Sequence, residues 1–125
     1  MRSRAWSALV LLSLGALTGC LAVAGTAVVG TAAYVGGDLE ARLETSPQRI
    51  VEASQAAFQE MEIRLISADA TGIDGQVIGR TALDRKIEIH VERDGETGSK
   101  LSIRVDTFGD EALSRQIFEK IRSKL

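Results

Sequence analysis

The chain has one cysteine, Cys20, and one histidine, His90, and these two side chains limit the chemistry that can be expected of it. His90 alternates with Glu88 and Glu92, which would suit an acid–base site in a hydrolase. Such an enzyme also needs a nucleophile, and no serine has a Gly-x-Ser-x-Gly context. One cysteine and one histidine are too few for a tetrahedral zinc site. We therefore expect no enzyme activity, metal or other cofactor, and keep a hydrolase using His90 as the alternative.

Cys20 ends a stretch with the three parts of a secretory signal. Arg2 and Arg4 form a basic start, residues 5–14 are apolar, and a Leu-Thr-Gly tripeptide precedes the cysteine. This pattern resembles the lipobox of bacterial lipoproteins, which implies cleavage between Gly19 and Cys20, a diacylglyceryl thioether and an acylated amine. Because each buried methylene contributes about 0.8 kcal/mol, more than one acyl chain would anchor the protein stably.

An uncleaved transmembrane helix is the competing interpretation of the same segment. No charge occurs from Ala5 to Val35, a run longer than the roughly 20 residues that a bilayer crossing needs. The run contains several glycines, and each costs a helix interior about 1 kcal/mol relative to alanine, so we favour the cleaved signal. Both interpretations keep Arg2 and Arg4 in the cytoplasm and export the rest of the chain.

Cleavage would leave a mildly acidic protein. It removes two of 15 basic residues and none of the 17 acids, so the net charge changes from −2 to −4. This balance gives no electrostatic footprint for nucleic acid, and attachment to the bilayer must come from the anchor. Leu21, rather than an aspartate, follows the cysteine; in the sorting rule of enteric lipoproteins this favours the outer membrane over the inner one, with the domain in the periplasm.

We divide the chain into a signal peptide (1–19), an apolar stem that includes the lipidated cysteine (20–37) and one small domain (38–125). The small residues Ala22, Thr26 and Gly30 are spaced four apart, a pattern that lets membrane helices approach closely and self-associate. A flexible apolar spacer explains the composition equally well. In both interpretations the Gly-Gly pair at 36–37 is a hinge into the domain.

The pattern of residues 38–125 predicts strands and two helices in one domain. The first helix begins with Ser46 as its N-cap and Pro47 at its first position, and the second begins near Asp110. Alternating polarity predicts strands over 38–44, 62–68, 85–93 and 100–105, and a turn-rich stretch leads to residues 76–83.

We expect an α+β fold: a four-stranded antiparallel sheet, in the order strand, helix, three-strand meander, helix, with two helices on one face. A tight turn in the last hairpin places Glu92 opposite Lys100 and Glu88 opposite Arg104. The preceding turn would bring Arg80 alongside Glu88. Such cross-strand pairs are typical of a charge-balanced sheet face in contact with solvent.

Two motifs carry a family resemblance. Residues 34–39 read YVGGDL, and residues 103–111 read IRVDTFGDE. With the lipobox, they make the chain similar to a domain-of-unknown-function (DUF) family of small bacterial lipoproteins. The resemblance implies the location in the cell envelope and the fold, but no activity, substrate or cofactor. Asp106 is a departure, because the family pattern leads us to expect a small residue there.

The second motif is the place where we expect any partner contact. An exposed Phe108 beside a helix N-terminus, with Gly109 and Asp110, would suit an envelope protein partner. The structural interpretation is favoured: Phe108 packs under the turn, Gly109 permits the reversal and Asp110 caps the helix. We therefore expect a membrane-anchored lipoprotein with a non-catalytic binding or accessory role, the alternative being a bitopic protein whose stem self-associates.

Overall fold

The computed structural model describes residues 31–125 as one α+β domain. The predictions for Gly19, Cys20, Ala22, Thr26 and Gly30 lie outside these residues. Neither helix in the described part of the chain combines the length and the apolar character that a membrane crossing needs.

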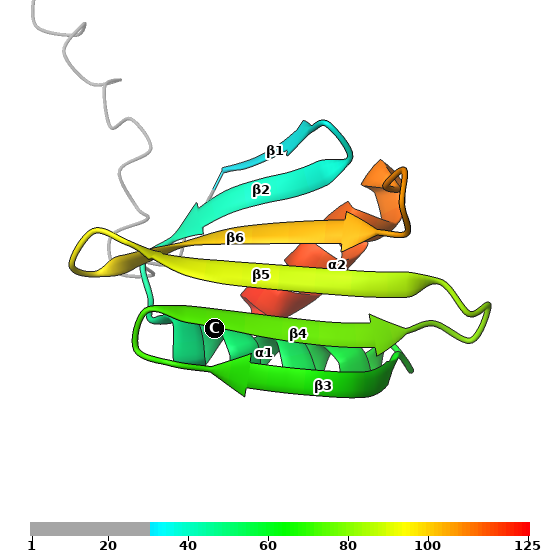
Figure 1. Cartoon of the computed structure of the whole chain (residues 1–125), viewed down its shortest axis with the longest axis horizontal. Coiled ribbons are helices and arrows are strands. Elements are labelled where there is room, and N and C mark those ends of the chain that lie inside the picture. Colours follow the sequence, from blue (N-terminus) through cyan, green and yellow to red (C-terminus); the bar gives the residue numbers. More distant parts are fainter. Residues whose placement is uncertain (1–30) are drawn as a thin grey trace, which may run out of the picture.

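A six-stranded antiparallel sheet forms one layer of the domain, with the strand order β1-β2-β6-β5-β4-β3 (Figure 1). The two helices lie behind it. The strands are β1 (Ala32–Val35), β2 (Asp38–Leu43), β3 (Arg64–Ala70), β4 (Asp74–Arg80), β5 (Lys86–Asp94) and β6 (Gly98–Val105), and the helices are α1 (Pro47–Glu60) and α2 (Glu111–Ser123).

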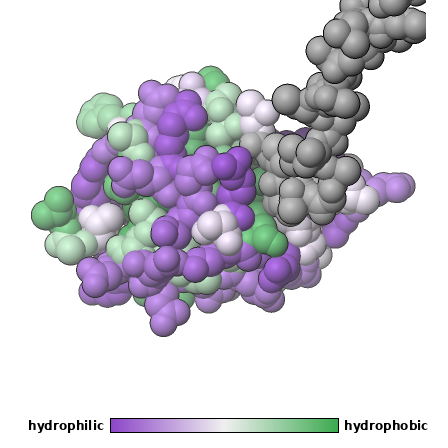
Figure 2. Space-filling view, turned by 180° about the vertical axis from the view of Figure 1, so that it is seen from behind, coloured by the Kyte–Doolittle hydropathy of each residue, from purple (hydrophilic) through white to green (hydrophobic). Residues whose placement is uncertain are grey.

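The helices cover different parts of one sheet face. α1 contacts β3, β4 and β5, α2 contacts β2 and β6, and the helices also pack against each other. The prediction for the start of α1 is confirmed: Ser46 is the N-cap, its Oγ accepts a 3.3 Å hydrogen bond from the backbone N–H of Arg49, and Pro47 is the first residue. Seen from behind, the helix side is largely hydrophilic, with scattered apolar groups (Figure 2).

The core lies between the helices and the sheet. Gly79 on β4 lets α1 approach, because a Cβ there would meet the ring of Phe58 at 2.6 Å. The largest fully buried side chains come from both helices and from four of the strands: Leu39, Leu43, Ile50, Phe58, Val77, Ile87, Ile89, Val91, Leu101, Ile103, Ile117 and Ile121.

The α+β class is confirmed, but the prediction of four strands is wrong. Residues 74–80 form a strand of their own, β4, so the meander after α1 has four strands rather than three. The remaining addition is β1, within the segment that we had assigned to the stem. The sheet therefore begins at Ala32, and Gly36 and Gly37 form the turn of a β1–β2 hairpin instead of a hinge.

The predicted register of the last hairpin is confirmed: Glu92 lies opposite Lys100 and Glu88 lies opposite Arg104. The placement of Arg80 is wrong. Arg80 lies opposite Lys86, and Ile78 takes the position opposite Glu88. The difference arises because the connection from β4 to β5 runs from 81 to 85 and is centred on residue 83, one residue before the turn that we expected.

Candidate functional site

Phe108 is the most exposed large apolar side chain among the described residues, at 90%. It lies between β6 and α2, where the chain reverses through two residues with positive φ, Asp106 (54°) and Gly109 (82°). The prediction that Phe108 packs under this turn is therefore wrong. The predicted role of Asp110 as helix cap is confirmed, because its carboxylate accepts a 3.0 Å hydrogen bond from the backbone N–H of Leu113.

Space under the turn is taken by the β1–β2 hairpin. A Cβ on Gly109 would collide with the carbonyl oxygen of Gly37 and the hydroxyl of Tyr34. A Cβ on Gly37 would in turn lie 3.0 Å from the carbonyl oxygen of Phe108. The two sequence motifs thus meet in space, and glycine is needed on both sides for the backbones to approach so closely.

Arg104, at the end of β6, joins the same two loops. Its guanidinium donates to both carboxylate oxygens of Asp38, at 2.7 and 3.0 Å. It also donates to the carbonyl oxygens of Gly36 (3.2 Å) and Thr107 (2.8 Å). The hydrogen bond that Arg104 donates to Asp38 raises the pKa of Arg104. One cation therefore holds the β1–β2 turn against the residue that precedes Phe108.

Arg85 joins a third loop to this turn. It lies between β4 and β5, and donates to Asp106 at 2.9 Å and to Asp110 at 2.7 Å. The hydrogen bond from Arg85 is the largest cause that lowers the pKa of Asp106, followed by the backbone N–H of Lys86. The pKa of Asp110 is also lowered, chiefly by the hydrogen bond from the backbone N–H of Leu113 and then by the one from Arg85. Both acids are held as carboxylates that accept from these donors.

Three large apolar side chains are exposed at this end of the sheet: one at the end of β1 and two in the connections that follow β4 and β6. Val35 is 61% exposed, Leu83 is 85% exposed and Phe108 is 90% exposed. They lie at the same end because β1 leads into the β1–β2 turn there, while β4 and β6 also end there (Figure 1). We call Val35, Leu83 and Phe108 the apolar tips; Arg85 and Arg104 cross-link the loops that carry them.

A family profile described as "Protein of unknown function (DUF3568)" matches residues 4–124. The chain belongs to this family. The match covers the described domain as far as residue 124 and extends upstream past Cys20 to residue 4. Comparison with curated proteins gives no match. The DUF3568 description itself names no activity.

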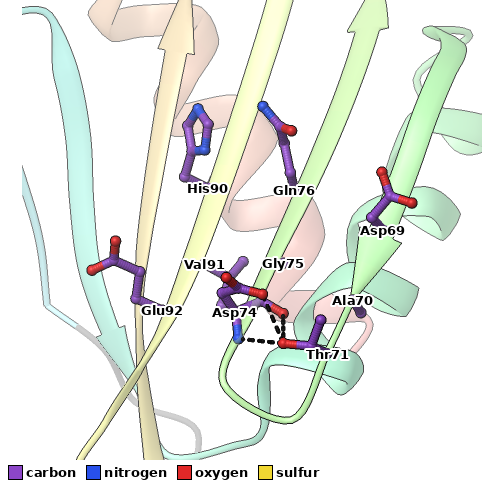
Figure 3. Close-up of a pocket in the computed structure, with 9 residues that line it drawn as sticks. All are labelled: Asp69, Ala70, Thr71, Asp74, Gly75, Gln76, His90, Val91 and Glu92. Carbon is purple, nitrogen blue, oxygen red and sulfur yellow. Dashed lines mark hydrogen bonds between the residues drawn. The ribbon is translucent and has the colours of Figure 1, made fainter.

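His90 of the DUF3568 domain lies on the open face of the sheet, in a shallow cleft (Figure 3). Its cross-strand neighbours are Ser102 on β6 and Gln76 on β4, whose amide lies beside the imidazole in the close-up. Of the acids proposed as its partners, Glu88 forms a 2.6 Å ion pair with Lys86, and Glu92 lies opposite Lys100. The ion pair directs Glu88 to Lys86, and within residues 31–125 neither carboxylate is joined to His90 by a hydrogen bond or an ion pair, so the arrangement gives His90 no orienting partner for acid–base work.

The cleft around His90 also contains Asp69, Asp74 and Glu92, but they do not converge (Figure 3). Asp74 is occupied by the β3–β4 turn, where its Oδ1 accepts a 2.7 Å hydrogen bond from Thr71. Within residues 31–125, no group of three histidine, cysteine, aspartate or glutamate side chains is placed to hold a metal ion.

Phe108, Gly109 and Asp110 are the residues that the sequence predicts for a partner contact. The structure places them at the same end of the sheet as Val35 and Leu83, which the sequence had not indicated as part of a site. Val35 and Leu83 escaped notice because each is a single apolar residue. The available signal was their context: Leu83 stands in the connection between two strands, directly before Asp84, and Val35 directly precedes two glycines. Apolar residues in such turns have no core to enter.

Proposed function

We propose that this DUF3568 protein is an exported lipoprotein, anchored in a membrane through acylated Cys20, whose domain binds an envelope protein without catalysing a reaction. The exposure of Phe108 on a braced turn is the observation that carries the binding role. A solvent-exposed aromatic side chain of this kind is typical of the residues that dominate protein interfaces.

The bracing of the turn supports this role. Binding orders the loops at an interface, and this ordering reduces the affinity. Here the loops that carry the apolar tips are already held by Arg85 and Arg104 before any partner arrives. A partner with an apolar pocket for Phe108 would therefore meet a preorganised surface.

The exposure of the acidic side chains around the apolar tips favours a protein over an anionic lipid surface. Arg85 and Arg104 donate to carboxylates and backbone carbonyls, and both side chains are only 33% exposed. Acidic side chains are the more open ones: that of Asp84, beside Leu83, is 81% exposed and that of Glu111 is 52% exposed. An anionic bilayer would repel such acids. A basic rim around an apolar pocket would complement them.

The proposed location in the cell envelope rests on the leader and the lipobox alone. The outer membrane is favoured over the inner one because Leu21 follows Cys20. Growth with radioactive palmitate tests the anchor: we expect label on the wild-type protein and none on a Cys20→Ala variant. An unlabelled wild-type protein would contradict the lipid anchor, and a labelled Cys20→Ala variant would place the acyl group elsewhere.

Capture of crosslinked partners from intact cells tests the binding role. Phe108→Ser removes the central aromatic group. Ile73→Ser is a matched control, because Ile73 is also apolar and 69% exposed but lies in the β3–β4 connection at the other end of the sheet. We expect the wild type and Ile73→Ser to retain the same partner and Phe108→Ser to lose it. Equal recovery by all three proteins would contradict the assignment of Phe108.

A further inference from the structure

Strand β3 forms an open edge of the sheet, at the side opposite β1. Among the described strands it pairs only with β4, and it carries two exposed large apolar residues, Leu65 (43% exposed) and Ile66 (51% exposed). A register shift between Leu65 and Ser67 makes Ile66 a bulge residue. An exposed apolar edge of this kind is a site at which another chain can associate, and a bulge limits how long a backbone ladder can grow there.

The helix beside this edge is uncharged where it borders the strand. Gln55, Ala56 and Gln59 line a surface groove between α1 and β3, together with the apolar side chains of Phe58, Ile63 and Leu65. Charged, exposed residues of α1 lie before and after this uncharged stripe of three helix residues: Arg49 and Glu52 precede it and Glu60 follows it. Depletion of charge around an apolar centre is the composition found at the middle of protein interfaces.

Two charges on β3 have no ion-pair partner among residues 31–125. Arg64 lies opposite Arg80, a like-charged pair, and Arg80 itself is paired with Asp84. Asp69, near the other end of the strand, lies opposite the neutral Gln76. Because Arg80 and Gln76 belong to the open face of the sheet, Arg64 and Asp69 share that face. Like charges opposite each other destabilise a sheet, so a carboxylate supplied from outside would stabilise Arg64.

We propose that β3 is the self-association surface of this protein and that its occupant is a second copy of the same strand, related by a twofold axis. An antiparallel copy centred between Ile66 and Ser67 places Asp69 of each chain beside Arg64 of the other. The same arrangement sets Leu65 opposite Ala68, and both of these residues lie on the helix side of the sheet.

Charge complementarity selects a second copy over an unrelated partner. The strand carries opposite charges on one face, arranged symmetrically about its middle. A twofold axis therefore places Arg64 of each chain opposite Asp69 of the other, which gives two opposite-charge contacts. Such an isologous contact closes on itself and does not extend into a fibre. Because the bulge at Ile66 interrupts a regular ladder, the contact rests mainly on Leu65, Ile66 and the uncharged stripe of α1.

A charge-swap series on the full-length, detergent-solubilised protein tests this contact. We expect a dimeric mass for the wild type in sedimentation equilibrium. Arg64→Asp and Asp69→Arg each bring like charges together in both symmetric contacts, and should weaken self-association by about tenfold or more. The double variant Arg64→Asp/Asp69→Arg restores opposite charges and should recover the dimer.

Two controls make every outcome decisive. Circular dichroism of each variant checks the fold, which exposed substitutions on an edge should leave intact. Gly30→Leu alters the small-residue pattern of the stem and should leave the dimer unchanged. A monomeric wild type, single variants that dimerise as tightly as the wild type, or a double variant that stays monomeric would overturn the proposal.

Discussion

Arg85 and Asp110 are joined by a 2.7 Å hydrogen bond that connects the β4–β5 loop to the first turn of α2. The same guanidinium reaches Asp106, which accepts in addition from the backbone N–H of Lys86 at 2.9 Å. The turn that displays Phe108 is thus held at both of its ends by one arginine. Its conformation depends on two carboxylates that must stay ionised.

This dependence predicts how stability changes with pH. Since the folded protein lowers the pKa of Asp106 and Asp110, the stability that they contribute is fully present above about pH 4, near the unfolded value. It is lost as the pH falls through the depressed pKa values. Arg85→Leu should lower stability at neutral pH and flatten this acid dependence, as measured by urea unfolding midpoints from neutral pH downward.

The flattening should be partial. The backbone N–H of Leu113 lowers the pKa of Asp110 more than Arg85 does, and its hydrogen bond survives the substitution. Arg115→Leu is the matched control. It removes an arginine of α2 that pairs only with Glu111, four residues away on the same helix. An acid profile of Arg85→Leu that coincides with those of the wild type and this control would contradict the bridging role of Arg85.

Gly109→Ala should destabilise the domain by about 2–5 kcal/mol. The substitution adds a Cβ at a positive φ and forces it against Gly37 and Tyr34. Gly36→Ala separates the two effects, since Gly36 also has a positive φ (60°) but nothing lies within 4 Å of its added Cβ. It should cost only about 1–2 kcal/mol. Chemical denaturation measures both, and equal losses would show that the loops do not pack as described.

The β1–β2 hairpin should be an integral part of the domain. A protein that begins at residue 38 lacks the strand that pairs with β2, the Gly36 carbonyl that Arg104 binds, and Tyr34. Its free energy of unfolding should be lower by about 2 kcal/mol or more than that of a protein that begins at residue 31, because a few hydrogen bonds are lost. Thermal melting of the two proteins checks this. Identical melting curves would return residues 31–37 to the role of a linker.

The parts of the fold that the sequence predicts well are those set by local rules. The β5–β6 hairpin has strict alternation on both sides of a short turn, so Glu88 and Glu92 were assigned their correct partners. Ser46 and Asp110 cap helices through hydrogen bonds to backbone groups three residues away, which a local pattern reveals. The error at Arg80 arose where the centre of a connection was ambiguous by one residue.

Long-range packing could not be predicted in this way. β1 consists of Ala-Ala-Tyr-Val inside an uncharged run, so its residues gave no polar alternation, and only pairing with β2 makes them a strand. Phe108 was expected inside because an aromatic residue usually gains from burial. The hairpin of Gly36 and Gly37 already fills the space beneath its turn, and this contact joins segments far apart in the chain.

Phe108→Ser should leave the stability of the domain within about 0.5 kcal/mol of the wild type, because a side chain that is 90% exposed makes few contacts. Leu101→Ala, at a fully buried position of β6, should cost about 2–5 kcal/mol in the same assay. Urea denaturation compares the two variants. A loss for Phe108→Ser approaching that of Leu101→Ala would mean that Phe108 is held in the fold rather than presented to a partner.

A photoreactive amino acid placed at position 108 in intact cells tests the central claim most directly. The account predicts a discrete protein adduct on irradiation from position 108, and no such adduct from position 73, where Ile73 is similarly exposed at the other end of the sheet. No adduct from position 108, or the same adducts from both positions, would contradict a binding role for the apolar tips.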